Sequence, residues 1–176
     1  RRKAQLLAFR HDLKIMDLRG NLTTRLSKLK DEKLRLSAIV VAVAGLKRLG
    51  MEAELTEILP YSIILPAVGQ GSLGIEIREG DKKTKELAGY LDHEPSRLVI
   101  SAERAFLKGL GGGCQVPIGA LGEVEGTNLK LRGAVISEDG KEIIKGETSG
   151  DKFRAVELGK KLAEDLLSKG AKKLLI

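Results

Sequence analysis

Cys114 is the only cysteine in the 176-residue chain, and it lies in a loop-forming sequence. Glycines occupy positions 111–113, and the segment 115–119 that follows ends in Gly119. A backbone so poor in side chains lets another molecule approach the sulfur closely. With one cysteine, an intrachain disulfide is excluded and a cysteine-based zinc site nearly so. The thiol is therefore either a nucleophile or covalent anchor, or a residue without a chemical role.

A second group of candidate residues consists of arginines in the first third of the chain. Residues 1–50 contain 13 Lys and Arg against 4 Asp and Glu, a local net charge of +9, whereas residues 51–176 have 18 against 20, a net −2. A guanidinium binds two oxygens of a carboxylate or phosphate at once, so several arginines in one crevice suit a ligand with several anionic groups. For any single arginine, a solvated basic surface is the alternative. The candidates are Arg1, Arg2, Arg19, Arg25 and Arg48.

Other polar residues give weaker signals. His11 and His93 are isolated and show no metal-ligand spacing, so no metal site is expected. The carboxylates of Asp12, Asp17 and Glu103 are interpreted as surface salt-bridge partners, and no catalytic pair stands out. The glycines at 69–74 precede a predicted strand rather than a helix, which is the wrong context for a nucleotide-binding loop.

The first part of the chain predicts an α/β unit. Strands are expected at 13–18 and 38–44, the second as a continuous apolar run that suits a buried parallel strand. Asn21 is the expected N-cap of a helix that runs to about Leu29. In a parallel sheet the carboxyl ends of strands meet at one edge, which would bring the arginines together.

The second part predicts an α+β unit. An uncharged segment at 60–74, with several glycines and prolines, is interpreted as a crossover between domains. A helix follows at 96–110, with Ser96 as its cap. Strands are expected near 118–125, 129–137 and 142–149, separated by hairpin signals.

Composition excludes several classes of protein. Aromatic residues make up 3% of the chain and tryptophan is absent, which disfavours a nucleic-acid-binding domain that stacks bases. No apolar run reaches the roughly 20 residues that a membrane span requires. A single cysteine fits a reducing cytoplasm. The opening Arg1-Arg2-Lys3, without methionine, suggests that a natural N-terminal part is absent.

Taken together, the motifs resemble those of the porphobilinogen deaminases, also called hydroxymethylbilane synthases, over essentially the whole chain. The resemblance corresponds to the C-terminal part of that family. It rests on Leu18-Arg19-Gly20-Asn21, Thr24-Arg25-Leu26, Ala44-Gly45-Leu46-Lys47-Arg48-Leu49-Gly50, Leu65-Pro66-Ala67-Val68-Gly69-Gln70-Gly71, Ala102-Glu103-Arg104-Ala105-Phe106-Leu107 and Gly112-Gly113-Cys114-Gln115-Val116-Pro117-Ile118-Gly119.

The resemblance implies a transferase of porphyrin and haem biosynthesis. Such an enzyme joins four porphobilinogen molecules into the linear tetrapyrrole hydroxymethylbilane and releases ammonia. It implies a dipyrromethane cofactor held by a thioether to Cys114. The acetate and propionate groups of the cofactor would be bound by the matching arginines, Arg1, Arg2, Arg19, Arg25 and Arg48. A non-catalytic oxyanion-binding α/β module is the alternative function.

The resemblance also implies a domain plan. Residues 1–65 would form most of domain 2, in a parallel-sheet fold like that of periplasmic binding proteins. Residues 66–91 would return to domain 1, and residues 92–176 would form domain 3, with a three-stranded antiparallel sheet. The family's catalytic aspartate has no counterpart here, so this chain alone is expected to be inactive. Its partners would be porphobilinogen, the growing oligopyrrole and the missing N-terminal segment, and the complete enzyme would be a cytoplasmic monomer.

Overall fold

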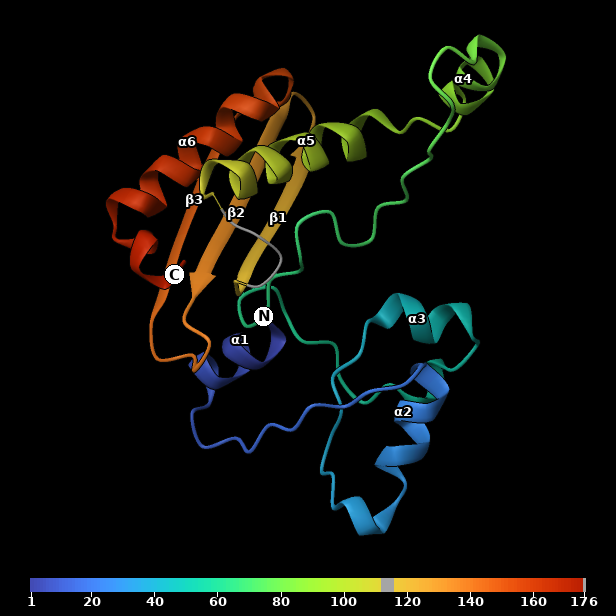
Figure 1. Ribbon diagram of the computed structural model, residues 1–176, viewed down its shortest axis with the longest axis vertical. Coiled ribbons are helices and arrows are strands. Elements are labelled where there is room, and N and C mark those ends of the chain that lie inside the picture. Colours follow the sequence, from blue (N-terminus) through green and yellow to red (C-terminus); the bar gives the residue numbers. More distant parts are fainter. Residues whose placement is uncertain (112–115, 176) are drawn as a thin grey trace. The chain divides into compact units, whose positions relative to one another are not determined.

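The computed structural model describes residues 1–111 and 116–175, which form two compact units (Figure 1). The larger unit combines residues 1–13 with residues 61–176, and the smaller comprises Lys14–Pro60. The crossover segment predicted near residue 60 therefore begins where the chain returns to the larger unit.

A three-stranded antiparallel sheet is the centre of the larger unit. Its strands, in the order β1-β2-β3, are Ile118–Glu125, Asn128–Ile136 and Ile143–Asp151. These bounds confirm the three strands and the hairpins expected from the sequence. The loop between β1 and β2 contains Gly126 at a φ of +60°, a conformation that glycine adopts without steric cost.

Two helices cover one face of this sheet, as Figure 1 shows: α5 (Glu94–Gly109) and α6 (Ala155–Ser168). The ring of Phe106 on α5 is fully buried against the sheet. Gly133 on β2 makes room for this ring, because a Cβ at that position would lie 2.5 Å from the ring's Cζ atom. The two helices touch without intervening side chains at Gly159, where a Cβ would lie 2.2 Å from the Ala102 carbonyl oxygen.

The opposite face of the sheet is covered only in part. Helix α1 (Arg2–Phe9) and Leu65 pack there against Ala134 and Ile136, in a small second core. Helix α4 (Lys82–Gly89) also belongs to the larger unit and has no buried residue. A 3₁₀ turn at Ala171–Leu174 follows α6.

The smaller unit contains helices α2 (Leu22–Leu29) and α3 (Val43–Arg48), with 3₁₀ turns at Glu32–Leu34 and Glu52–Glu54. Asn21 caps α2 as predicted, because its side chain accepts a hydrogen bond from the Thr24 N–H at 2.8 Å. Leu26 on α2 and Leu46 on α3 are buried.

The strands predicted at 13–18 and 38–44 are absent from these described residues, so the parallel-sheet prediction is not reproduced. Val43 and Ala44 instead begin α3. A buried parallel strand exchanges hydrogen bonds with neighbours, and the described residues of this unit form no pair of strands. The cap of α5 also differs from prediction: His93 takes this role, with Nδ1 accepting from the Ser96 N–H.

Candidate functional site

The Cys114 loop connects α5 to β1. Cys114 itself lies outside the described residues, as do positions 112, 113 and 115. Leu110, just before the loop, is 5% exposed and belongs to the main core. After the loop, the Ile136 N–H donates to the Pro117 carbonyl at 3.1 Å. Both ends of the loop are thus fixed to the larger unit.

The crossover segment lies along the start of β1. The Ala120 N–H donates to the Pro66 carbonyl at 3.1 Å, which ties the segment to the outer edge of the strand. Gly119 allows this approach, because a Cβ there would lie 2.8 Å from the Leu65 Cβ. Gln5 on α1 forms a reciprocal pair with Leu65: its Nε2 donates to the carbonyl at 3.0 Å and its Oε1 accepts from the N–H at 2.7 Å.

Glu103 on α5 joins the crossover to β1. It is 4% exposed, and its two carboxylate oxygens accept from the Gly69 N–H at 2.7 Å and the Gly122 N–H at 2.9 Å. Burial raises the pKa of this carboxyl, while the two backbone hydrogen bonds act in the opposite direction. Glu103 is therefore a buried connecting residue, and its interpretation as a surface salt-bridge partner was wrong.

The sequence did contain a signal for the burial of Glu103. Apolar residues recur around Glu103 at helical spacing: Val99 lies four residues before it, Phe106 three residues after it and Leu110 seven residues after it. This spacing places all four residues on one face of the helix. A charged residue on an apolar face is buried only when its hydrogen bonds are satisfied. The N–H groups that satisfy it lie 34 and 19 residues away in sequence, and no local pattern indicates them.

Arg1 also lies against the crossover. Its guanidinium donates to the Leu65 carbonyl at 2.8 Å and to Gln70 Oε1 at 3.0 Å. Burial, with a smaller contribution from the charge of Arg2, lowers the pKa of Arg1. These bonds use two of the five N–H donors of a guanidinium. Arg2 is the first residue of α1 and is partly buried.

The other three candidate arginines lie in the smaller unit. Arg19 is exposed and precedes the turn that opens α2. Arg25 on α2 is partly buried, and its Nε donates to the Gly20 carbonyl at 2.8 Å. Arg48 is exposed in the last turn of α3.

A close contact between α2 and α3 relates two of these arginines. A Cβ at Gly45 would lie 3.1 Å from Leu22 Cδ2, so the two helices touch at this point. Arg25 follows Leu22 by three positions on α2, and Arg48 follows Gly45 by three positions on α3. Residues three apart lie on the same face of a helix. Each of these arginines therefore lies one turn along its own helix from the contact.

The charges of these three arginines are not neutralised by ion pairs within the described part of the chain. In the smaller unit, the ion pair between described residues joins Lys30 Nζ to Glu54 Oε1 at 2.7 Å. A guanidinium without a protein carboxylate is available to an anionic ligand.

The remaining polar candidates contribute no site. Asp12 pairs with Arg10 at 2.6 Å, and the hydrogen bond from Arg10 lowers the pKa of its carboxyl. Asp17 and His11 are exposed. Among residues 1–111 and 116–175, no group of three His, Cys, Asp or Glu side chains could hold a metal ion.

Comparison with known families gives matches across most of the chain. Residues 1–86 match the family model described as "Porphobilinogen deaminase, dipyromethane cofactor binding domain". Residues 98–168 match "Porphobilinogen deaminase, C-terminal domain". The chain belongs to the porphobilinogen deaminase family. This membership does not favour the alternative of a non-catalytic oxyanion-binding module.

Individual porphobilinogen deaminases are similar to the chain throughout its length. The protein from Pelotomaculum thermopropionicum is 50% identical over 175 residues, which is 99% of this chain and 55% of the relative. That from Carboxydothermus hydrogenoformans is 52% identical, with 99% and 56% covered. That from Thermus thermophilus is 49% identical, with 99% and 58% covered. The chain therefore spans little more than half the length of these porphobilinogen deaminases.

In the described residues, the helices are all too short or too polar to cross a lipid bilayer.

Proposed function

We propose that this chain functions as part of a porphobilinogen deaminase, which joins four porphobilinogen molecules into hydroxymethylbilane and releases ammonia. The observation that carries the proposal is the similarity to the cofactor-binding and C-terminal models of one family, in their family order. Porphobilinogen and the growing oligopyrrole are its substrates. We place the activity in the cytoplasm, where a lone thiol remains reduced.

Cys114 is the attachment point of a dipyrromethane cofactor in this proposal. The Cys114 thiolate would hold the cofactor through a thioether to the pyrrole methylene carbon that is left when ammonia is lost, and the proton of the thiol would leave with that ammonia. The product is a thioether, so the sulfur tethers the pyrroles and is not released in each turnover. The bound cofactor supplies the terminal pyrrole carbon to which new units are added.

The arginines hold the acetate and propionate groups of the cofactor and product. Support comes from the ion pairs of the smaller unit, which leave Arg19, Arg25 and Arg48 without a carboxylate among the described residues. Arg1 and Arg2 belong to the same proposed set. A carboxylate removed from water without a cationic partner would carry a large desolvation cost, which a guanidinium offsets.

The proposal includes a domain plan with a parallel sheet. Residues 1–65 contribute to a periplasmic-binding-protein-like domain, residues 66–91 to domain 1, and residues 92–176 to domain 3. The segments at 13–18 and 38–44 become strands when neighbouring strands of the longer enzyme pair with them. Catalysis requires an aspartate supplied by that longer enzyme, which acts as a monomer, and the 176-residue chain alone is inactive.

Intact-mass spectrometry of a chimaera tests this proposal. The chain is fused to the remaining N-terminal portion of the Pelotomaculum relative, and the purified protein is weighed and assayed with porphobilinogen. The expected mass exceeds that of the polypeptide by two linked pyrrole units. This excess disappears in Cys114→Ala. A chimaera that forms hydroxymethylbilane with an unmodified Cys114 would refute the tether.

The arginine assignment is tested in the same chimaera. Arg19→Gln, Arg25→Gln and Arg48→Gln should each impair cofactor assembly or chain elongation, which is seen as missing or truncated pyrrole adducts by mass. Arg154→Gln is the matched control, because Arg154 is an exposed arginine that pairs with Glu157. Normal turnover in all three variants would remove their carboxylate-binding role.

A further inference from the structure

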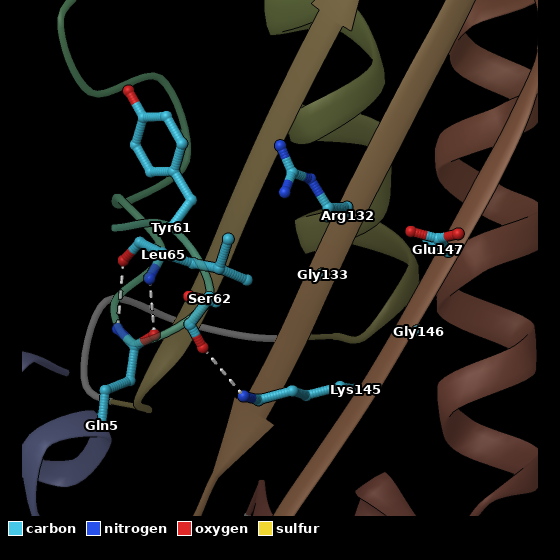
Figure 2. A pocket seen from close by; sticks show the side chains of 9 residues that line it. All are labelled: Gln5, Tyr61, Ser62, Leu65, Arg132, Gly133, Lys145, Gly146 and Glu147. Atoms are coloured by element: carbon cyan, nitrogen blue, oxygen red, sulfur yellow. Dashed lines mark hydrogen bonds between the residues drawn. The ribbon is translucent and has the colours of Figure 1, made fainter. Parts of the chain in front are cut away.

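A pocket of about 330 Å³ opens on the face of the sheet opposite α5 and α6 (Figure 2). The crossover residues Tyr61, Ser62 and Leu65 form one side of it. Strands β2 and β3 form the other. This size is within the range of small-molecule sites, which start at about 300 Å³. All of its lining residues belong to the larger unit.

The register of the sheet explains which side chains enter the pocket. Gly133 and Gly146 are direct partners across β2 and β3, and their missing side chains would point to the helices, against Phe106 and Leu166. Their neighbours point the other way, because side chains alternate along a strand. Arg132, Lys145 and Glu147 are therefore displayed on the pocket side, over a floor of glycine backbone.

The charges around the pocket do not cancel. Arg132 forms an ion pair with Glu123, although Glu147 is its direct partner in the register. Glu147 instead pairs with Lys130 at 3.0 Å. Lys145 has no carboxylate partner among residues 1–111 and 116–175. Its ammonium makes one long contact, 3.5 Å to the Ser62 carbonyl, which Figure 2 shows as a dashed line. One positive charge in the wall thus remains unmatched.

Arg132 adds a second cation at the same place. Its Nε is buried and has no hydrogen-bond partner in the described part of the chain. Because that atom is shielded from solvent, a ligand in the pocket would meet the terminal NH₂ groups of the guanidinium, one of which also pairs with Glu123. Arg132 and Lys145 are diagonal neighbours across the two strands, close enough for two long side chains to approach one small anion.

We propose that this pocket binds a small organic monocarboxylate. The carboxylate lies between Lys145 and Arg132, and the apolar part of the ligand lies against Tyr61 and Leu65. A single unmatched cation fits one negative charge, and Glu147 in the wall disfavours a second. The site thus differs in charge from the arginine set assigned to polyanionic pyrroles, and it does not depend on that assignment.

Benzoate is a suitable probe, with neutral benzamide as the isosteric comparison. Both are titrated into the isotope-labelled 176-residue chain, and the amide signals of Gly133 and Gly146 are followed by NMR. Benzoate should shift these signals to saturation. Benzamide should bind about tenfold more weakly, because a charged partner strengthens a hydrogen bond by about that factor.

The benzoate affinity of three variants tests which charged side chains contribute to the pocket. Lys145→Gln should weaken benzoate binding about tenfold, and Glu147→Gln should strengthen it. Lys141→Gln removes the same charge from the exposed turn before β3 and should change the affinity less than about twofold, because salt screens distant charges. Signal dispersion in each spectrum reports that the variant is folded. The proposal is overturned if benzoate leaves the two glycine signals unshifted, if benzamide binds equally well, or if Lys141→Gln weakens binding as much as Lys145→Gln.

Discussion

Replacing Glu103 with alanine should destabilise the larger unit by about 2 to 3 kcal/mol. The substitution removes the acceptor of two backbone N–H groups, at Gly69 and Gly122, which lie 2.7 and 2.9 Å from its oxygens. A buried donor left without an acceptor costs about 1 to 3 kcal/mol. Because both of these bonds are only part-buried, the lower end of this range applies to each N–H group.

Glu103→Gln separates hydrogen bonding from charge. The glutamine oxygen can accept from one N–H, while its NH₂ group faces the other, so about half of the loss is expected. Burial raises the pKa of Glu103, which means that the folded state favours the protonated carboxyl. We therefore compare the free energy of unfolding of the wild type with that of Glu103→Gln as a function of pH. The difference should shift in favour of the wild type as pH falls through the raised folded-state pKa toward the ordinary value of 4.5, and against it as pH rises over the same interval.

Urea unfolding followed by circular dichroism measures these differences, and amide hydrogen exchange at Gly69 and Gly122 reports them locally. Glu94→Gln is the matched control on the same helix. Glu94 pairs with Lys152 at 3.1 Å but is exposed, so its replacement should cost less than about 1 kcal/mol. Equal losses in Glu103→Gln and Glu94→Gln, or unchanged exchange at the two glycine amides in Glu103→Ala, would refute the role given to Glu103.

Four further predictions concern helix packing, a helical glycine, capping and acid stability. Gly159→Ala should destabilise by about 3 kcal/mol in urea unfolding, because its Cβ would lie 2.2 Å from a backbone oxygen of α5. Gly89→Ala, in a helix with open space around it, should stabilise by about 0.5 to 1 kcal/mol. Asn21→Ala should cost about 1 kcal/mol, because it removes the cap of α2. The measurement is the decrease in the temperature of half-unfolding, followed by the helical circular-dichroism signal. Hydrogen bonds from the Ser137 hydroxyl and the Lys141 N–H lower the pKa of Asp139 from its ordinary value of 3.8 to about 2. The stabilising contribution of this carboxylate is therefore present above pH 3.8 and disappears as pH falls toward 2. Acid unfolding of Asp139→Asn should accordingly begin at a higher pH than that of the wild type.

The antiparallel sheet was predictable because its signals are local. Strand β2 alternates apolar residues at Leu129, Leu131 and Val135, and glycine-containing turns such as Gly126 separate the strands by few residues. The predicted strands at 13–18 and 38–44 show the limit of this approach. An apolar run indicates that a segment can be buried, but hydrogen-bonded neighbours decide whether it becomes a strand.

Among the candidate site residues, too, those with a local sequence signal were predicted and those that depend on distant partners were not. Arg19, Arg25 and Arg48 were predicted from charge and motif, and their carboxylate-binding role stays a prediction, although the structure leaves them without ion pairs to described carboxylates. The role of Glu103 was missed because its partners come from distant segments. The assignment of Cys114 lies outside the described residues and stays a prediction.

The contact between the crossover and β1 has a practical consequence for dissecting the protein. A strand at the edge of a sheet presents unpaired backbone groups that can recruit another chain. Here Pro66 occupies the outer edge of β1 through its bond from Ala120, and Leu65 fills the space beside Gly119. A shorter piece that began at residue 92 would uncover this edge together with the apolar patch under Leu65. Such a piece is expected to self-associate on expression. A piece that keeps the crossover should remain monomeric, because the crossover covers the edge of β1.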